Sequence, residues 1–239
     1  GAEIALASGH LQVKDLKATL SSGRLSGALD VDAGKDIPPV AIMLRSPAQE
    51  LASLLPRLGV PFPMRGQMEL DLNVTGAGAT PRAIAASLGG HLGVAVGRGS
   101  IDSRMLEMAA GELWRVLVPG APRGDTSITC IALRFDIAHG VAVARTLLAD
   151  TAPARISGEG NLNLGTERLA LVLTPTLRLA GGGISVPVDV GGSFAHPSYR
   201  PNPLGTLGAL GGLAGGAAAG AGQGAAIGGP LGAIVGGIV

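Results

Sequence analysis

The feature that most constrains the fold is a repeated alternation of apolar and polar residues. In the segment 67–75, every second side chain is apolar, and 154–164 repeats the pattern. Further copies run through 24–32, 130–137 and 184–190. Successive side chains of a β-strand point to opposite sides, so this period is typical of a sheet with one apolar and one solvated face. The sequence therefore predicts a mainly β protein built on an antiparallel sheet.

Glycine and proline positions refine this prediction. Glycine-bearing turns are expected at 21–23, 138–140 and 164–166. Pro187 lies inside one alternating segment, which indicates an edge strand or a bulge there. Three glycines inside strands indicate bulges or close backbone approach: Gly27, Gly158 and Gly160. Weaker patterns predict additional strands near 10–20, 39–45, 90–97, 141–148 and 167–173.

Three short helices are expected between the strands, which makes the class α+β. Ser46, Pro47 and Gln49 match an N-terminal capping pattern, and the helix behind them would present the stripe Leu51, Leu54, Leu55 and Leu58. Thr80 and Pro81 predict a second helix in the same manner. A third is predicted from about 103 to 118. We expect these helices to plug the ends or edges of the sheet.

The C-terminal segment differs from the rest of the chain. Of 40 glycines, many lie beyond Asn202, where no charged residue occurs. We place a domain boundary near 201–203, giving a β-rich domain, 1–203, and a Gly/Ala-rich tail, 204–239. One interpretation is a flexible low-complexity tail. The other is a membrane-inserting or self-associating glycine zipper, because glycines recurring every fourth residue would share one helix face. These are Gly208, Gly212, Gly216, Gly220, Gly224, Gly228, Gly232 and Gly236.

The sequence offers no catalytic constellation. The four histidines are widely separated, and the spacing of neighbouring carboxylates places them on a solvated strand face. Cys130 is the one cysteine and lies in a predicted strand, so we interpret it as an inert thiol. A net charge of +1 and only five aromatic residues argue against nucleic-acid binding. We therefore predict that the chain is not an enzyme and has no catalytic residues, cofactor or metal site.

The order of motifs resembles the C-terminal region of the AsmA family of bacterial envelope proteins. The first carrying segment, at 66–102, reads GQMELDLNVTGAGATPRAIAASLGGHLGVAVGRGSID. The second, at 129–175, contains a Cys-bearing strand and a hairpin whose matching positions are Gly158, Gly160, Leu164, Thr166, Glu167 and Leu169. The third, at 186–203, reads VPVDVGGSFAHPSYRPNP and resembles the closing strand of the family. The match extends over nearly all of 1–203.

The resemblance implies an elongated, curved antiparallel sheet or groove with short interspersed helices. It also implies a periplasmic part of a protein anchored in the bacterial inner membrane, which handles phospholipid and supports outer-membrane assembly. Family members carry an N-terminal transmembrane helix, which this sequence does not show, so we expect a C-terminal fragment. The implied partners are phospholipid acyl chains, other envelope proteins, and the membrane through that anchor or the tail.

An aliphatic groove would suit acyl chains, because burying a CH₂ group is worth about 0.8 kcal/mol and needs no directional contact. The alternative interpretation is that the same residues pack against the short helices. The candidate lipid-facing residues are Met68, Leu70, Leu72, Val74, Ile156, Leu162 and Leu164. A second functional hypothesis is a structural, self-associating β-rich envelope scaffold, with the glycine-rich tail as its interaction element.

Overall fold

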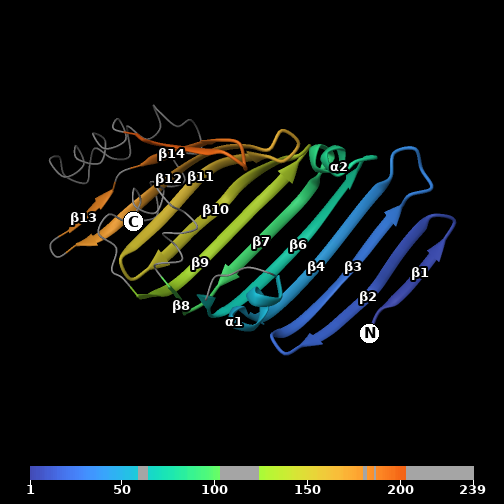
Figure 1. Cartoon of the computed structure of the whole chain (residues 1–239), viewed down its shortest axis with the longest axis horizontal. Coiled ribbons are helices and arrows are strands. Elements are labelled where there is room, and N and C mark those ends of the chain that lie inside the picture. The colour runs from blue at the N-terminus through green and yellow to red at the C-terminus, as the bar shows by residue number, and fades with distance from the viewer. Residues whose placement is uncertain (59–63, 103–123, 180–181, 186, 203–239) are drawn as a thin grey trace, which may run out of the picture.

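The computed structural model describes residues 1–58, 64–102, 124–179, 182–185 and 187–202, which form one large curved sheet (Figure 1). Two short helices, α1 (Leu51–Leu54) and α2 (Pro81–Ser87), and a 3-10 turn at Leu55–Leu58 accompany it. The strands are β1 (Glu3–Ala7), β2 (His10–Leu20), β3 (Gly23–Asp32), β4 (Pro39–Glu50), β5 (Met64–Arg65), β6 (Gln67–Ala77), β7 (Gly89–Val96), β8 (Gly99–Asp102), β9 (Asp125–Ala138), β10 (Val141–Thr151), β11 (Ala154–Asn163), β12 (Arg168–Leu179), β13 (Gly182–Ser185), β14 (Val188–Gly192) and β15 (Pro197–Pro201).

The strands pair in nearly the order in which they occur in the chain. The main path is β1-β2-β3-β4-β6-β7-β9-β10-β11-β12-β14-β15, while β5 pairs with β8, β8 with β9, and β13 with β12. All of these pairings are antiparallel. β1 and β15 are the two ends of this path, so the sheet is not closed. The prediction of a mainly β, curved antiparallel sheet is confirmed.

The hairpins follow the expected turn chemistry. Ser8 and Gly9 join β1 to β2 with φ values of 49° and 81°, and His139 and Gly140 join β9 to β10 with 49° and 71°. Two successive residues with positive φ form the type I′ turn, whose twist matches that of the flanking strands. The predicted turns at 21–23, 138–140 and 164–166 all connect neighbouring strands, as expected.

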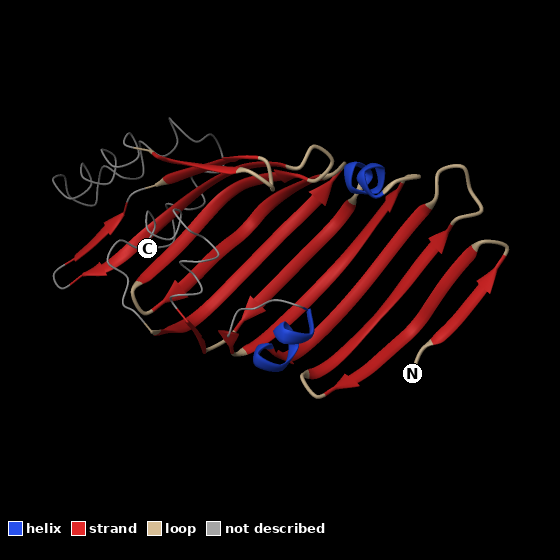
Figure 2. Cartoon of the chain, in the orientation of Figure 1, coloured by secondary structure: helices blue, strands red, loops and turns tan. Residues whose placement is uncertain are grey.

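α2 forms where the sequence predicts it, at one end of the strands (Figure 2). Thr80 Oγ1 accepts a hydrogen bond from the Ala83 N–H at 3.2 Å, which caps the helix. The Gly140 N–H donates to the Leu88 carbonyl at 2.8 Å, and Arg82 Nε donates to the Gly165 carbonyl at 3.0 Å. α2 therefore links the ends of two hairpins, β9–β10 and β11–β12.

Two local predictions are wrong. The helix expected to begin behind Ser46 starts at Leu51 instead, because 46–50 continue strand β4 through a bulge. The segment 184–190 is not one strand: β13 and β14 pair with different stretches of β12, and Pro187, which cannot donate to a ladder, lies between them. The predicted helix at 103–118 and the tail at 204–239 lie outside the described residues, and the domain boundary near 201–203 remains a prediction.

Candidate functional site: the apolar face of the sheet

Residues that are paired across antiparallel strands share a face, so the register defines the two faces of this sheet. One unbroken row crosses ten strands on a single face: Ile4, Val13, Leu29, Ile42, Val74, Gly90, Ile137, Ala142, Leu162 and Leu169. A second row on the same face joins Met68, Val96, Ile131, Ala149, Ile156 and Pro175. We call this surface the apolar face.

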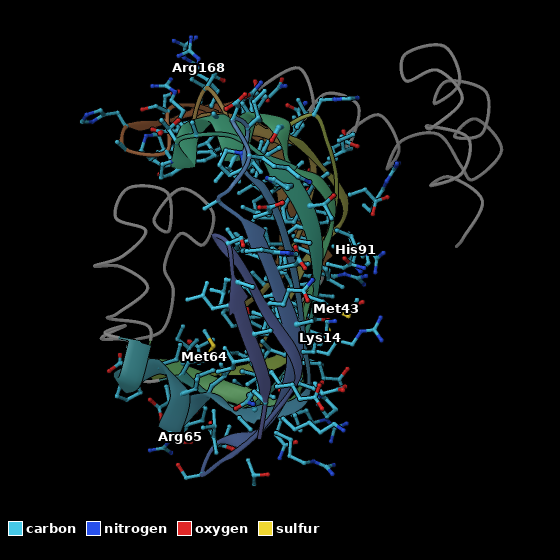
Figure 3. The ribbon with its side chains drawn as sticks, turned by 90° about the vertical axis from the view of Figure 1, so that its right-hand side faces the viewer. Lys14, Met43, Met64, Arg65, His91 and Arg168 are labelled. Atoms are coloured by element: carbon cyan, nitrogen blue, oxygen red, sulfur yellow. The ribbon has the colours of Figure 1, made fainter. Side chains whose placement is uncertain are left out.

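The apolar face lies on the inside of the bend. In Figure 3 the labelled side chains of Lys14, Met43 and His91 lie on the outer side of the curved sheet, whereas Met64 lies on the inner side. By register, those three residues occupy the face opposite to the rows above. Within the described strands, no Asp, Glu, Lys or Arg occupies a register-paired position on the apolar face.

Exposure on the apolar face varies along the sheet. Val74 and Phe135 near the middle are 5% and 9% exposed, whereas Ile4 and Leu6 of the edge strand β1 are 70% and 74% exposed. A buried cluster made of Ala154, Ile156, Val188 and Val190 forms where β11, β12 and β14 curl together. The apolar residues are therefore most deeply buried near the C-terminal strands and most exposed at β1.

The register places six of the seven candidate lipid-facing residues on the apolar face. Met68, Leu70, Leu72 and Val74 come from β6, and Ile156 and Leu162 come from β11. Leu164 lies in the turn after β11, where its N–H donates to the Gly140 carbonyl at 2.8 Å. Ile156 belongs to the buried cluster near the C-terminal strands. That any of these residues contacts lipid stays a prediction.

A few polar residues do occupy the apolar face, but they are buried and hydrogen-bonded. Gln49 is 3% exposed, accepts from Ser22 Oγ at 2.7 Å and donates to the Arg24 carbonyl at 3.0 Å. Ser46, also 3% exposed, donates from Oγ to the same carbonyl at 2.7 Å. This cluster holds the bulge of β4 against β3. Its side chains therefore act within the fold and present no charge to the groove.

The outer face carries the charges, which form cross-strand pairs. Asp71 accepts from Arg45 Nε at 3.1 Å and lies 3.2 Å from His91 Nε2. Burial alone would raise the pKa of Asp71, but the hydrogen bonds from Arg45 and His91 outweigh it and lower that pKa below the ordinary value. The spacing of His91 and Asp71 in the sequence does not reveal this pair, because only the register between β6 and β7 brings the two side chains together.

The same arrangement recurs on both sides of this pair. The hydrogen bond from Arg145 Nε at 2.8 Å lowers the pKa of Asp136, and the contact with His10 at 3.0 Å lowers that of Asp30. The outer face also holds a shallow hollow of about 580 Å³, whose lining includes Arg45, Glu69, Ala95 and Arg134. Leu70, Val94 and Leu133 also border this hollow, so its lining combines charged, small and aliphatic residues.

The described residues contain no cluster of three or more His, Cys, Asp or Glu side chains that could hold a metal ion. Neither helix in this part of the chain has the length and apolarity needed to cross a membrane. Cys130 is half-buried in β9.

Comparisons with known proteins agree with this architecture. The family model described as "AsmA family" matches residues 1–147. A similar curated protein is "AsmA family protein YhjG" of Escherichia coli (strain K12), 24% identical over 216 residues, which are 87% of this chain and 31% of that protein. The chain thus spans about a third of the length of that relative, and no solved structure matches it significantly. Because this family model matches more than half of its residues, the chain belongs to the AsmA family.

Proposed function

We propose that the apolar face binds the acyl chains of phospholipids. The observation that carries the proposal is the lack of charged residues at the register-paired positions of this face in the described strands. An acyl chain needs apolar area and no directional partner, and each buried CH₂ group contributes about 0.8 kcal/mol. One row of uncharged residues crosses ten strands, and all its members except Gly90 have aliphatic side chains that supply such area.

Membership of the AsmA family implies an envelope protein. On this basis we infer a noncatalytic periplasmic module of a protein anchored in the inner membrane, which supports outer-membrane assembly through phospholipid transport. The chain spans about a third of the length of that relative, so we propose the anchor and the transport for the whole protein. The proposed partners are phospholipid acyl chains, other envelope proteins and the membrane, and no nucleic acid.

Uptake of a fluorescently labelled phospholipid by the purified chain tests this function. Leu70→Asp places a carboxylate in the middle of the apolar face and is expected to reduce uptake at least tenfold. Met43→Asp is the matched control, because Met43 lies on the outer face and is 39% exposed. Equal uptake by both variants, or no uptake by the unaltered chain, would contradict acyl-chain binding at this face.

A self-associating envelope scaffold is the second candidate, and the exposed edge strand β1 favours it. Ile4 and Leu6 are 70% and 74% exposed, and within the described sheet β1 pairs on one side alone. An unpaired edge with exposed apolar residues is a template for pairing with another chain. Analytical ultracentrifugation separates the candidates: a scaffold predicts oligomers that Leu6→Lys dissolves, whereas a monomer at all concentrations would contradict it.

A further inference from the structure

We infer that the uncharged tail, residues 203–239, occupies the apolar face when no lipid is bound and competes with acyl chains for it. The inference rests on the proposed function, because it concerns the regulation of the same surface. The inferred occupant is a segment of this chain, which continues from the last strand of the sheet.

The first argument is the match in charge. From Pro203 to Val239 the tail contains no Asp, Glu, Lys, Arg or His. The apolar face carries no Asp, Glu, Lys or Arg at the register-paired positions of the described strands. A charged segment would lose hydration on this face without gaining a partner. The tail has no charged side chain to desolvate, and its Leu, Ile, Val and Ala side chains would gain apolar contact.

The second argument is the place where the tail begins. Pro201 ends β15 in register with Val188, and Val188 is in register with Leu173 in the middle of β12. Leu173 in turn pairs with Gly158 on β11. The chain therefore leaves the last strand at mid-height of the groove and not at its rim. A segment starting there begins level with the middle of β11 and β12, beside the rows of the apolar face.

The third argument is length. At the helical rise of 1.5 Å per residue, residues 203–239 would reach about 55 Å. The twelve strands of the main path, spaced by about 4.8 Å, span about 53 Å. Any more extended conformation reaches further. The tail is thus long enough to contact the apolar face from β15 to the open end at β1.

The small residues of the tail fit a shared surface. A groove that must also accept lipid needs an occupant that is displaced easily, and glycine and alanine bury little apolar area per residue. The few large side chains in the tail, Leu207 and Leu210 among them, would supply the contacts that hold it in place. Such an occupant would shield the half-exposed leucines from water and still yield to two acyl chains.

Photo-cross-linking in the full chain tests where the tail lies. A photoreactive amino acid replaces Leu92 on the apolar face, and the matched control replaces the neighbouring His91 on the outer face. Mass spectrometry of the lipid-free monomer is expected to find cross-links from position 92 to peptides within 203–239 and none from position 91. Equal cross-linking from both positions, or none from position 92, would overturn the inference.

Two outcomes identify the rival roles of the tail. Mixing isotope-labelled and unlabelled chains reveals whether the cross-links join separate molecules, and links from position 92 of one copy to the tail of another would overturn the inference in favour of self-association. Protection of the tail from protease on adding phosphatidylglycerol/phosphatidylethanolamine vesicles, without any prior link to position 92, would overturn it in favour of membrane insertion.

A charged tail tests the competition. In the variant Ala218→Asp/Ala225→Asp/Ala226→Asp, the tail should no longer occupy the apolar face. The affinity of this variant for labelled phospholipid should therefore rise at least threefold. The control replaces the same alanines by serine and should bind as the unaltered chain does. Equal binding by all three chains would overturn the inference and leave acyl-chain binding standing. No binding by any chain would instead overturn the proposed function, and the competition with it.

Discussion

Leu70 of β6 and Leu133 of β9 flank Val94 of β7 in one apolar row, since both leucines are in register with that valine. Neighbouring strands are about 4.8 Å apart, so the side chains of such a row touch and form a continuous apolar strip perpendicular to the strands. The residues that alternate with them, such as Asp71 and Arg134, point to the outer face. Substitutions at two adjacent positions of a strand therefore test the two faces at the same place in the sheet.

The first prediction compares the adjacent residues Val94 and Ala95 of β7, which lie on opposite faces. Val94→Asp should reduce the binding of an apolar fluorescent dye at least fivefold, because it puts a charge in the strip between Leu70 and Leu133. Ala95→Asp, one residue along β7, lies on the exposed outer face and should leave dye binding unchanged. Dye titration measures both. A loss of binding in the Ala95 variant alone would reverse the assignment of the faces.

The second prediction concerns two glycines of β11. Gly160 has a φ of +124°, and a Cβ there would lie 2.1 Å from the Ala170 carbonyl oxygen, so Gly160→Ala should lower the free energy of unfolding by at least about 1 kcal/mol. At Gly158 the nearest atoms, at 2.7 Å and 2.8 Å, are the ends of the Leu173 and Leu147 side chains, which can shift. Gly158→Ala should cost less. Urea unfolding ranks the two variants, and the reverse order would refute the prediction.

The third prediction concerns the buried amide of Gln49. Gln49→Leu leaves Ser22 Oγ and the Arg24 carbonyl without this partner, so the free energy of unfolding should fall by about 1–3 kcal/mol. Gln67→Leu is the control, because Gln67 is exposed at the start of β6 and should have little effect. Adding Ser22→Ala to Gln49→Leu should restore part of the lost free energy of unfolding, measured by chemical denaturation. If the effects of the two substitutions on that free energy simply add, the interaction between Ser22 and Gln49 would be refuted.

The fourth prediction concerns the pKa of Asp136. The hydrogen bond from Arg145 is the main cause of its lowered pKa. Arg145→Gln should therefore raise that pKa towards the ordinary value of an aspartate, about 3.9. Arg134→Gln should have a smaller effect, because Arg134 Nε lies 3.7 Å from the carboxylate and Arg145 Nε lies 2.8 Å from it. Carbon-13 NMR of the carboxyl group gives both values, and a larger shift in the Arg134 variant would contradict the geometry.

The same pairing fixes the sign of the pH dependence. The folded-state pKa of Asp136 is below that of the unfolded chain, so its pairing stabilises the fold above the unfolded pKa and that contribution is lost as the pH falls through the lowered folded pKa. Because the pair is exposed, the effect on stability should be small and should weaken further in salt.

The alternation of apolar and polar residues predicted most of the fold. It predicted β6 and β11 closely and assigned the faces of Met68 and Leu162 correctly, because alternation reports directly on which side of a sheet is solvated. It did not predict β1, whose exposed Ile4 and Leu6 alternate with alanine and so give a weak signal. The capping pattern at Ser46 failed, because the bulge in β4 gives the same residues buried hydrogen-bond partners across the sheet.

The pairing of partners across strands could not be read from the sequence. Asp71 and His91 are twenty residues apart, and only the register of the hairpin between β6 and β7 brings them to 3.2 Å. The same holds for the rows of the apolar face, whose continuity depends on the bulges that keep each strand in phase. Sequence alternation therefore indicates that an apolar face exists, whereas the register shows which of its residues are neighbours across the strands.

The central claim, that lipid acyl chains lie on the apolar face, is tested most directly at Leu72 and Asn73. These neighbours in β6 are in register with Leu92 and His91 and so lie on opposite faces at one point of the sheet. A photoreactive amino acid at each position, irradiated in the bacterial envelope, should give a phospholipid adduct at position 72 and none at position 73. Adducts of equal yield at the two positions, or an adduct at position 73 alone, would contradict the claim.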